Sequence, residues 1–184
     1  MGNVVDITRD PRFRAAKADR AYLAYSKACS LDEDERTLDE ARALYEKAVA
    51  LNPDFAIAYT NLGNVHYREG RLDKALDCYA RALLTDRRQP EALYNTGYIA
   101  LEDNDHERAY FWFTQAIKAD PNFADAHYNF AVTCSLLRDT ERARQHFEKC
   151  LALNPNASWA PSATQYLEQL TLTASKRQKV KEKP

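Results

Sequence analysis

The chain of 184 residues is 45% hydrophobic and 29% charged, a composition typical of a globular domain that excludes a disordered or fibrous protein. Its 26 basic and 27 acidic residues give a formal net charge of -1, so the molecule as a whole does not attract nucleic acid or an anionic membrane. No apolar run is long enough to predict a membrane span.

The N-terminal segment, residues 1–12, carries no helical pattern and no signal-peptide pattern, so we expect it to be disordered. Residues 13–172 then read as one domain of helix pairs. The predicted helices cover 15–30 and 37–50, 54–69 and 72–85, 89–102 and 106–118, and 122–137 and 140–153. A ninth helix is predicted over 159–172, followed by a basic tail, 173–184, that we expect to be disordered.

The helix pairs repeat with a period of 34 residues, over the ranges 20–55, 56–89, 90–123 and 124–157. Six columns keep this register. They contain Ala41, Ala75, Ala109 and Ala143; Tyr45, Tyr79, Phe113 and Phe147; Ala48, Ala82, Ala116 and Cys150; Pro53, Arg87, Pro121 and Pro155; Gly63, Gly97 and Ala131; and Asn61, Asn95 and Asn129.

Each column has a physical reason. Small residues such as Gly63 and Ala75 let two helices approach closely, and the aromatic column fills the larger gap toward the neighbouring pair. Proline after Asn or Asp stops the second helix, because the residue before proline avoids the helical conformation.

Three departures from the pattern stand out. Arg87 replaces the proline, although Pro90 restores a break soon after it. Asn104 and Arg138 stand where Gly70 stands, so their turns tolerate a positive φ less well. If Tyr22 matches Tyr59, the first repeat has three extra residues, which lengthen its inter-helix turn into a solvated acidic segment.

The ninth helix has a cap-like pattern. Trp159, Ala163, Tyr166, Leu167 and Leu170 fall on one helical face. The last repeat of a stack leaves an apolar surface that needs a cover, so we expect this helix to provide it.

The segment from Ala58 to Leu83 resembles the tetratricopeptide repeat (TPR), with Leu62-Gly63, Gly70, Ala75, Tyr79 and Ala82 as its characteristic residues. The resemblance covers roughly residues 20–156. It implies an all-α, right-handed superhelical solenoid of antiparallel helix pairs whose first helices line a concave groove.

The sequence shows no catalytic pattern, and we expect no enzyme activity, cofactor or metal. The four histidines lie on different repeats, and neither H-E-x-x-H nor a phosphate-binding loop occurs. His127 and Cys134 share a helix face, which favours packing over metal binding. The cysteines form no C-x-x-C pair and match no zinc pattern, and unpaired thiols favour the cytoplasm.

The groove is the predicted site. Asparagine amides along it can pair with either backbone group of an extended peptide, and tyrosines are common contact residues. The predicted groove residues are Asn61, Asn64, Tyr67, Tyr94, Asn95, Tyr98, Tyr128 and Asn129. The alternative is that these residues only pack neighbouring helices together.

Repeat domains of this kind that hold acidic chaperone C-termini use a clamp of Lys, Asn and Arg. Here the asparagines are present without the basic residues, and Glu91 and Asp125 repel a carboxylate, so this reading is disfavoured. We therefore predict an adaptor or scaffold that binds a peptide segment of a protein partner, with no small-molecule substrate. A chaperone of secreted subunits and a self-assembling scaffold are the alternatives, and a nucleic-acid or membrane tether through the basic tail is disfavoured.

Overall fold

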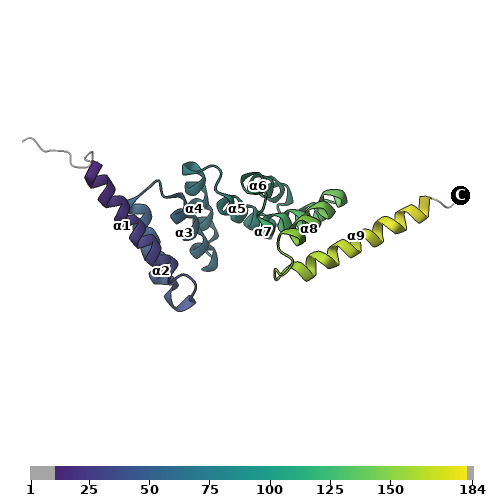
Figure 1. The fold of residues 1–184 in the computed structure, drawn as a ribbon, viewed down its shortest axis with the longest axis horizontal. Helices are drawn as coiled ribbons and strands as arrows, with labels where there is room; N and C mark the ends of the chain where they lie inside the picture. Colours follow the sequence, from purple (N-terminus) through teal and green to yellow (C-terminus); the bar gives the residue numbers. More distant parts are fainter. Residues whose placement is uncertain (1–10, 182–184) are drawn as a thin grey trace, which may run out of the picture. The chain divides into compact units, whose positions relative to one another are not determined.

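The computed structural model describes the backbone of residues 11–181 and, within that range, the side chains other than those at 12, 13 and 171–181. All regular elements in this range are helical (Figure 1). They are α1 (Pro11–Cys29), the short 3-10 helix η2 (Glu35–Thr37), α2 (Leu38–Leu51), α3 (Ala56–Arg68), α4 (Leu72–Thr85), α5 (Pro90–Glu102), α6 (His106–Ala119), α7 (Ala124–Leu136), α8 (Thr140–Leu153) and α9 (Ala160–Lys181). The all-α prediction is confirmed.

Most helix ends lie within two residues of the predicted ones, and the two terminal helices differ most. α1 begins at Pro11 rather than near residue 15, because proline suits the first position of a helix, where its missing N–H has no partner to lose. α9 continues to Lys181, so residues 173–181 are helical where the sequence predicted disorder. This stretch is rich in Lys, Gln and Arg and has no Gly or Pro to stop the helix. Residues 1–10 and 182–184 lie outside the described residues.

The chain separates into two compact units, Met1–Ala92 and Leu93–Pro184, and the boundary falls inside α5. In the first unit, α1 packs on α2, α2 on α3 and α3 on α4. In the second unit, α6 packs on α7, α7 on α8 and α8 on α9. Each unit is therefore a stack of helix pairs, as the 34-residue period predicts.

The glycine column marks the closest contact within a pair. A Cβ atom at Gly63 would lie 2.5 Å from Cε1 of Tyr79, and one at Gly97 would lie 3.0 Å from the ring of Phe113. The aromatic rings therefore lie over the glycines of their own pair, and do not only fill the gap toward the next pair. Any side chain at Gly63 would displace the Tyr79 ring.

The three short turns between paired helices share one conformation. Gly70, Asn104 and Arg138 have φ of 73°, 60° and 63°. In each turn this residue donates its N–H to the carbonyl three residues back, and the next residue donates to the carbonyl five residues back, as from Asp139 to Cys134 at 2.9 Å. This left-handed closure satisfies the last carbonyls of the first helix.

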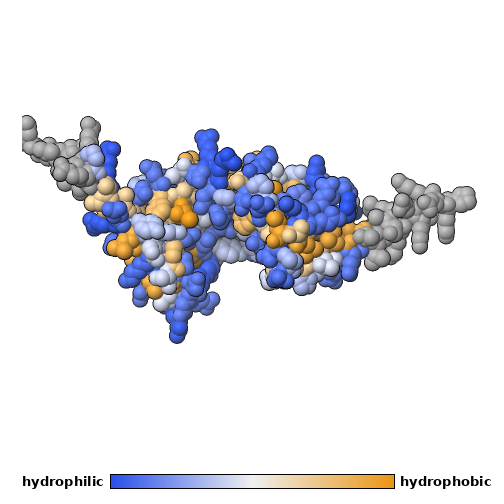
Figure 2. Space-filling model, in the orientation of Figure 1, coloured by the Kyte–Doolittle hydropathy of each residue, from blue (hydrophilic) through white to orange (hydrophobic). Residues whose placement is uncertain are grey.

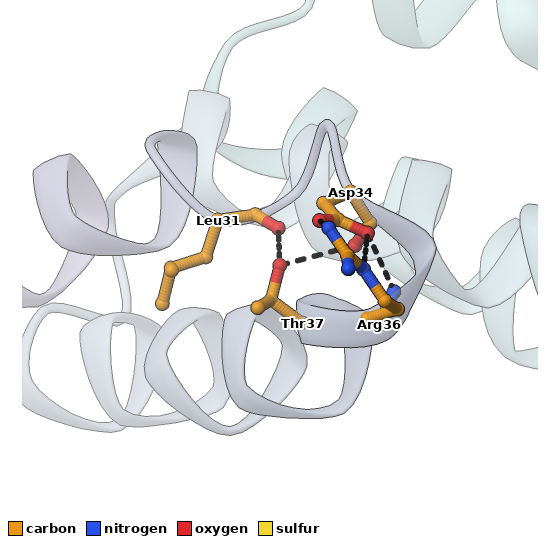
Figure 3. Close-up of polar contacts among 4 residues, drawn as sticks. All are labelled: Leu31, Asp34, Arg36 and Thr37. Carbon is orange, nitrogen blue, oxygen red and sulfur yellow. Dashed lines mark hydrogen bonds and ion pairs between the residues drawn. The ribbon is translucent and has the colours of Figure 1, made fainter.

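The turn between α1 and α2 is longer and closed by side chains (Figure 3). Asp34 caps η2 by accepting from the Arg36 N–H at 2.9 Å, and the Arg36 guanidinium pairs with the same carboxylate at 2.7 Å. Thr37 donates its hydroxyl to the carbonyls of Leu31 at 2.5 Å and Asp34 at 3.1 Å. The guanidinium and the N–H of Arg36 lower the pKa of the Asp34 carboxyl. Asp34 of the acidic segment is thus engaged in closing its own turn.

Candidate functional site

Tyr94 on α5 sits between two aromatic rings of the second unit. Its ring centroid lies 5.8 Å from that of Phe113 on α6 and 4.9 Å from that of Phe123, which immediately precedes α7. Tilted rings at these distances are favourable aromatic pairs. The tyrosine therefore ties the first helix of one pair to the start of the next pair.

Tyr128, at the equivalent position 34 residues on, repeats this arrangement on α7. It packs edge-on to Phe147 with a centroid distance of 5.9 Å and stacks on Trp159 at 5.1 Å. The Trp159 indole N–H donates to the Asp125 carboxylate at 2.5 Å. Trp159 precedes α9, so α9 follows α7 in the way that α7 follows α5.

Asn129 joins α7 to α5. Its side chain is 8% exposed, and its Nδ2 donates to the Tyr94 hydroxyl at 2.8 Å. Burial is the main reason that the pKa of Tyr94 is raised, followed by the charge of Asp125, so the phenol stays protonated. Asn129 therefore helps to hold α5 and α7 together, and little of its amide is left exposed to bind a ligand.

Asn95 and Tyr98 lie on α5 beside Tyr94, and both side chains are half-buried. The Tyr98 ring centroid is 6.2 Å from that of Tyr94. These two residues keep part of their surface open, as a contact residue requires.

Between α7 and α9 lies a pocket of about 280 Å³, lined by Tyr128, Ser162, Gln165, Tyr166 and Gln169. Burial, and then the nearby Tyr166, raise the pKa of Tyr128, while a hydrogen bond with Ser162 opposes the rise. Tyr166 stacks on Phe147 at 5.1 Å. The lining offers hydroxyl and amide groups and no charged side chain.

The four α9 residues of this lining, Ser162, Gln165, Tyr166 and Gln169, are absent from the predicted site. Their spacing of three and four residues on one helix was the available signal. Most of the predicted apolar face of α9 packs inward: Ala163 belongs to the core of the second unit, with Trp159, Leu167 and Leu170 against it. Tyr166, the fifth residue of that face, is 37% exposed.

In the first unit, Tyr25 occupies the place that Tyr94 and Tyr128 occupy in the second. Its ring centroid lies 5.9 Å from that of Tyr45 and 4.9 Å from that of Phe55. The predicted match of Tyr22 with Tyr59 is therefore wrong, and Tyr22 is 64% exposed. With Tyr25 in the register of Thr60, the first repeat has one extra residue rather than three, because α1 ends early and the following turn is longer.

Asn61 belongs to a polar cluster on the same unit. Its Nδ2 donates to the Tyr45 hydroxyl at 3.2 Å and approaches Cys29 Sγ at 3.7 Å. The Tyr45 hydroxyl donates in turn to the Asp32 carboxylate. Burial, followed by hydrogen bonds to Asp32 and Cys29, raises the pKa of Tyr45. Burial also raises the pKa of Tyr25 to about 12, so both phenols are neutral donors.

Asn64 and Tyr67 lie further along α3, and both are half-buried. The Asn64 carbonyl oxygen accepts from the Tyr79 hydroxyl at 2.9 Å. Asn61, Asn64 and Asn129 thus each bond a tyrosine on another helix, and the sequence did not predict this amide–phenol pairing.

Thr60 stands at the position that Tyr25, Tyr94 and Tyr128 occupy in the other helix pairs. Its hydroxyl donates to Gln89 Oε1 at 2.8 Å, and the same oxygen accepts from the Ala92 N–H at 3.1 Å. Both side chains are buried. A satisfied polar pair here replaces the aromatic pair that the other repeats use.

Two histidines form a pair inside the second unit. His127 Nδ1 lies 2.8 Å from His146 Nδ1, and His127 Nε2 lies 3.0 Å from the Pro121 carbonyl. Burial lowers the pKa of both, and that of His146 falls to about 4. No group of three metal-ligating side chains occurs among the described residues.

Three family models match the sequence. One described as TPR repeat covers residues 37–70, and two described as tetratricopeptide repeat cover 62–121 and 112–145. No curated protein matches the sequence. Within the described residues, no helix is both long and apolar enough to cross a membrane.

Solved structures show the same fold. A structure of pilF from Pseudomonas aeruginosa superposes with a TM-score of 0.67 at 24% identity, over 90% of this chain and 70% of that one. The first TPR of Spaghetti (RPAP3), bound to the HSP90 peptide SRMEEVD, gives 0.59 at 22% identity, over 65% of this chain and 93% of that one. A structure of MamA gives 0.60 at 18% identity, over 80% and 95% of the two chains.

The 34-residue columns, the helix pairs and three adjoining family matches agree, and the chain belongs to the tetratricopeptide-repeat family.

Proposed function

We propose that this protein is an interaction scaffold that binds an uncharged, extended segment of a protein partner on the face formed by α5, α7 and α9. The observation that carries the proposal is the pocket between α7 and α9, which aligns tyrosine rings with amide and hydroxyl groups. Family membership supports protein binding in general, and the pocket supports this place on the second unit.

The chemistry of the lining suits a peptide. Gln165 and Gln169 supply both donors and acceptors, so they match a main-chain N–H and C=O equally well. Tyr128 and Tyr166 supply rigid rings at low conformational cost. A pocket of about 280 Å³ is smaller than most small-molecule sites, and its size suits one or two side chains of a peptide.

Charge argues against an acidic segment such as the one bound in the Spaghetti structure. The pocket lining has no basic side chain, and Asp125 lies on α7 beside Trp159. A carboxylate held here would lack the charge-assisted hydrogen bonds that make such contacts strong. A neutral or weakly basic segment fits better.

Asn95 and Tyr98 extend this face onto α5, where Tyr94 and Asn129 already hold the helices together. The predicted residues of the first unit, Asn61, Asn64 and Tyr67, remain a prediction as contact residues. Asn61 and Asn64 each have a packing role.

Affinity capture from a lysate of the source organism tests the proposal, followed by calorimetry with peptides of the captured protein. Replacing Gln165 and Gln169 by Ala, or Asn95 and Tyr98 by Ala, is expected to cost about 2–4 kcal/mol of binding with an unchanged helical spectrum. The matched control replaces Gln145 and Lys149 on α8, at the same spacing. Loss of binding in the control alone would place recognition on the second helices, and the proposal would be abandoned.

A further inference from the structure

The seam between α1 and α2 forms an open groove with an apolar floor. One pocket of about 240 Å³ is lined by Arg20, Leu23, Ala24, Lys27, Leu44 and Lys47. A second, of about 410 Å³, is lined by Arg14, Lys17, Ala18, Leu51, Asn52, Pro53 and Asp54. The lining residues follow one another at steps of three and four on each helix, so both pockets lie along one side of an antiparallel pair.

The equivalent positions of later pairs are covered. Leu23 stands two residues before Tyr25, as Ala58 stands before Thr60 and Ala126 before Tyr128. Leu23 is 71% exposed, whereas Ala58 and Ala126 are 0% exposed. Ala58 lies in one cluster with Ala48 of α2, the second helix of the preceding pair. In this fold a helix therefore covers that position, and among the described residues no helix does so at Leu23.

The rim of the groove is basic. Its lining contains five cationic side chains, on Arg14, Lys17, Arg20, Lys27 and Lys47, and one carboxylate, on Asp54. The net charge of the whole chain is -1, so this positive charge is a local concentration. Figure 2 shows hydrophobic surface over α1 and α2 with hydrophilic residues beside it. Local charge of this kind selects an oppositely charged partner and speeds its encounter.

We propose that this α1–α2 groove docks an acidic amphipathic helix of a protein partner. The helix would place apolar residues on Leu23 and Leu44 and carboxylates beside Lys27, Lys47 and Arg20. From Arg14 to Lys27 the groove is about 20 Å long, which corresponds to a helix of about 13 residues. A helix is the shape that covers the same seam at Ala58.

A lipid surface fits the groove less well. Membrane-bound amphipathic helices present a broad, convex apolar face. On α1 the apolar residues Ala21, Ala24 and Ala28 are buried, and among the side chains described there the large exposed ones are Tyr22 and Leu23. A floor between two helices receives a third helix more readily than a flat bilayer.

Fluorescence anisotropy with the full chain tests the docking site. The probe is a labelled, acetylated peptide of about 15 residues with leucines on one helical face and glutamates on both sides of it. The control peptide has lysines in place of the glutamates. The acidic peptide is expected to bind at least about tenfold more tightly than its lysine counterpart at low salt.

Two exposed-residue variants decide the result, because neither disturbs the core. Leu23→Ser is expected to weaken the binding of the acidic peptide severalfold. The double change Lys27→Glu with Lys47→Glu is expected to make the lysine peptide bind more tightly than the acidic one. Asn95→Ala with Tyr98→Ala should leave this binding unchanged, which separates the groove from the α5–α7–α9 face.

Several outcomes would overturn the proposal. These are equal binding of the two peptides, or no binding of either. Phosphatidylserine vesicles that bind with the same dependence on Leu23 and the lysines, while the peptide does not, would assign the groove to a membrane. A dimer that dissociates in Leu23→Ser would assign it to a second copy. A large gain in peptide affinity on removal of residues 1–10 would assign it to the chain's own N-terminal segment.

Discussion

The three equivalent turns at Gly70, Asn104 and Arg138 allow a direct measurement of backbone strain. All three residues have a positive φ, yet one is glycine, one asparagine and one arginine. A left-handed conformation costs an ordinary L-residue about 1–2 kcal/mol. Glycine avoids this strain but loses about 0.4–1 kcal/mol through the greater freedom of its unfolded chain. Arg138→Gly should therefore stabilise the protein by about 0.5–1 kcal/mol.

The reverse change should destabilise it. A Cβ atom at Gly70 would meet nothing within 4 Å, so Gly70→Ala adds strain without a clash. We expect a loss of about 0.5–1 kcal/mol, again as the difference between strain and unfolded-chain entropy. Asn104→Gly should change little, because asparagine tolerates this conformation.

Urea denaturation followed by circular dichroism at 222 nm measures these differences, with the midpoint compared at constant slope. Arg138→Ala is the control, since it removes the exposed side chain and keeps the strain. A stabilisation by Arg138→Ala equal to that by Arg138→Gly would show that the arginine side chain, and not the backbone, is the cause. A destabilising Arg138→Gly would contradict the reasoning outright.

Five further changes probe the packing and one buried titration. Ala109→Leu should cost about 1–3 kcal/mol by overfilling a fully buried helix contact, measured as a lower thermal midpoint. Asn129→Ala should cost about 1 kcal/mol by removing the hydrogen bond to Tyr94, and Tyr94→Phe should cost a similar amount in the same urea assay. Removal of residues 157–184 should expose Phe147 and its neighbours, and light scattering should then detect aggregation. A truncated chain that stays soluble and equally stable would contradict a covering role for α9. Burial, the proximity of His127 and the charge of Arg142 lower the pKa of His146 from 6.5 to about 4. Because the unfolded chain therefore binds this proton at a higher pH than the folded chain does, the free energy of unfolding should fall by about 1–2 kcal/mol as the pH drops from 6.5 to 4. His146→Phe should flatten this pH dependence in urea titrations.

The sequence predicted the fold because each helix pair repeats the same small and aromatic columns. The small column that includes Gly63 and the aromatic column that includes Tyr79 both follow from periodicity, a local property of the chain, whereas the direct contact between these two residues was not predicted. The first repeat was misaligned because α1 ends early, and a longer turn stabilised by Thr37 and Asp34 compensates. Periodicity gives no signal for such a compensation.

The site was predicted less completely. The residue type of Asn61 or Asn129 does not reveal whether its amide faces a partner or a tyrosine, since both depend on contacts between distant helices. The helical spacing of Ser162, Gln165 and Gln169 on α9 was visible in the sequence, but these residues lie outside the 34-residue repeats and so had no equivalent positions for comparison. The exposure of Leu23 was equally hidden, because alanine and leucine both suit a covered position.

The thiols of Cys134 on α7 and Cys150 on α8 are buried and give the protein internal reporters of its own opening, and Cys78 on α4 is half-buried. Burial raises the pKa of Cys78 and Cys150 to about 11 and that of Cys134 to about 12. At neutral pH these sulfurs are thiols rather than thiolates, and thiols react slowly with alkylating reagents. Cys134 and Cys150 become reactive when α7 and α8 open, so their rates of labelling follow the second unit, whereas the half-buried Cys78 can also react in the folded first unit. The local stability of the α7–α8 pair is thus measurable on the unmodified chain, before any partner is known.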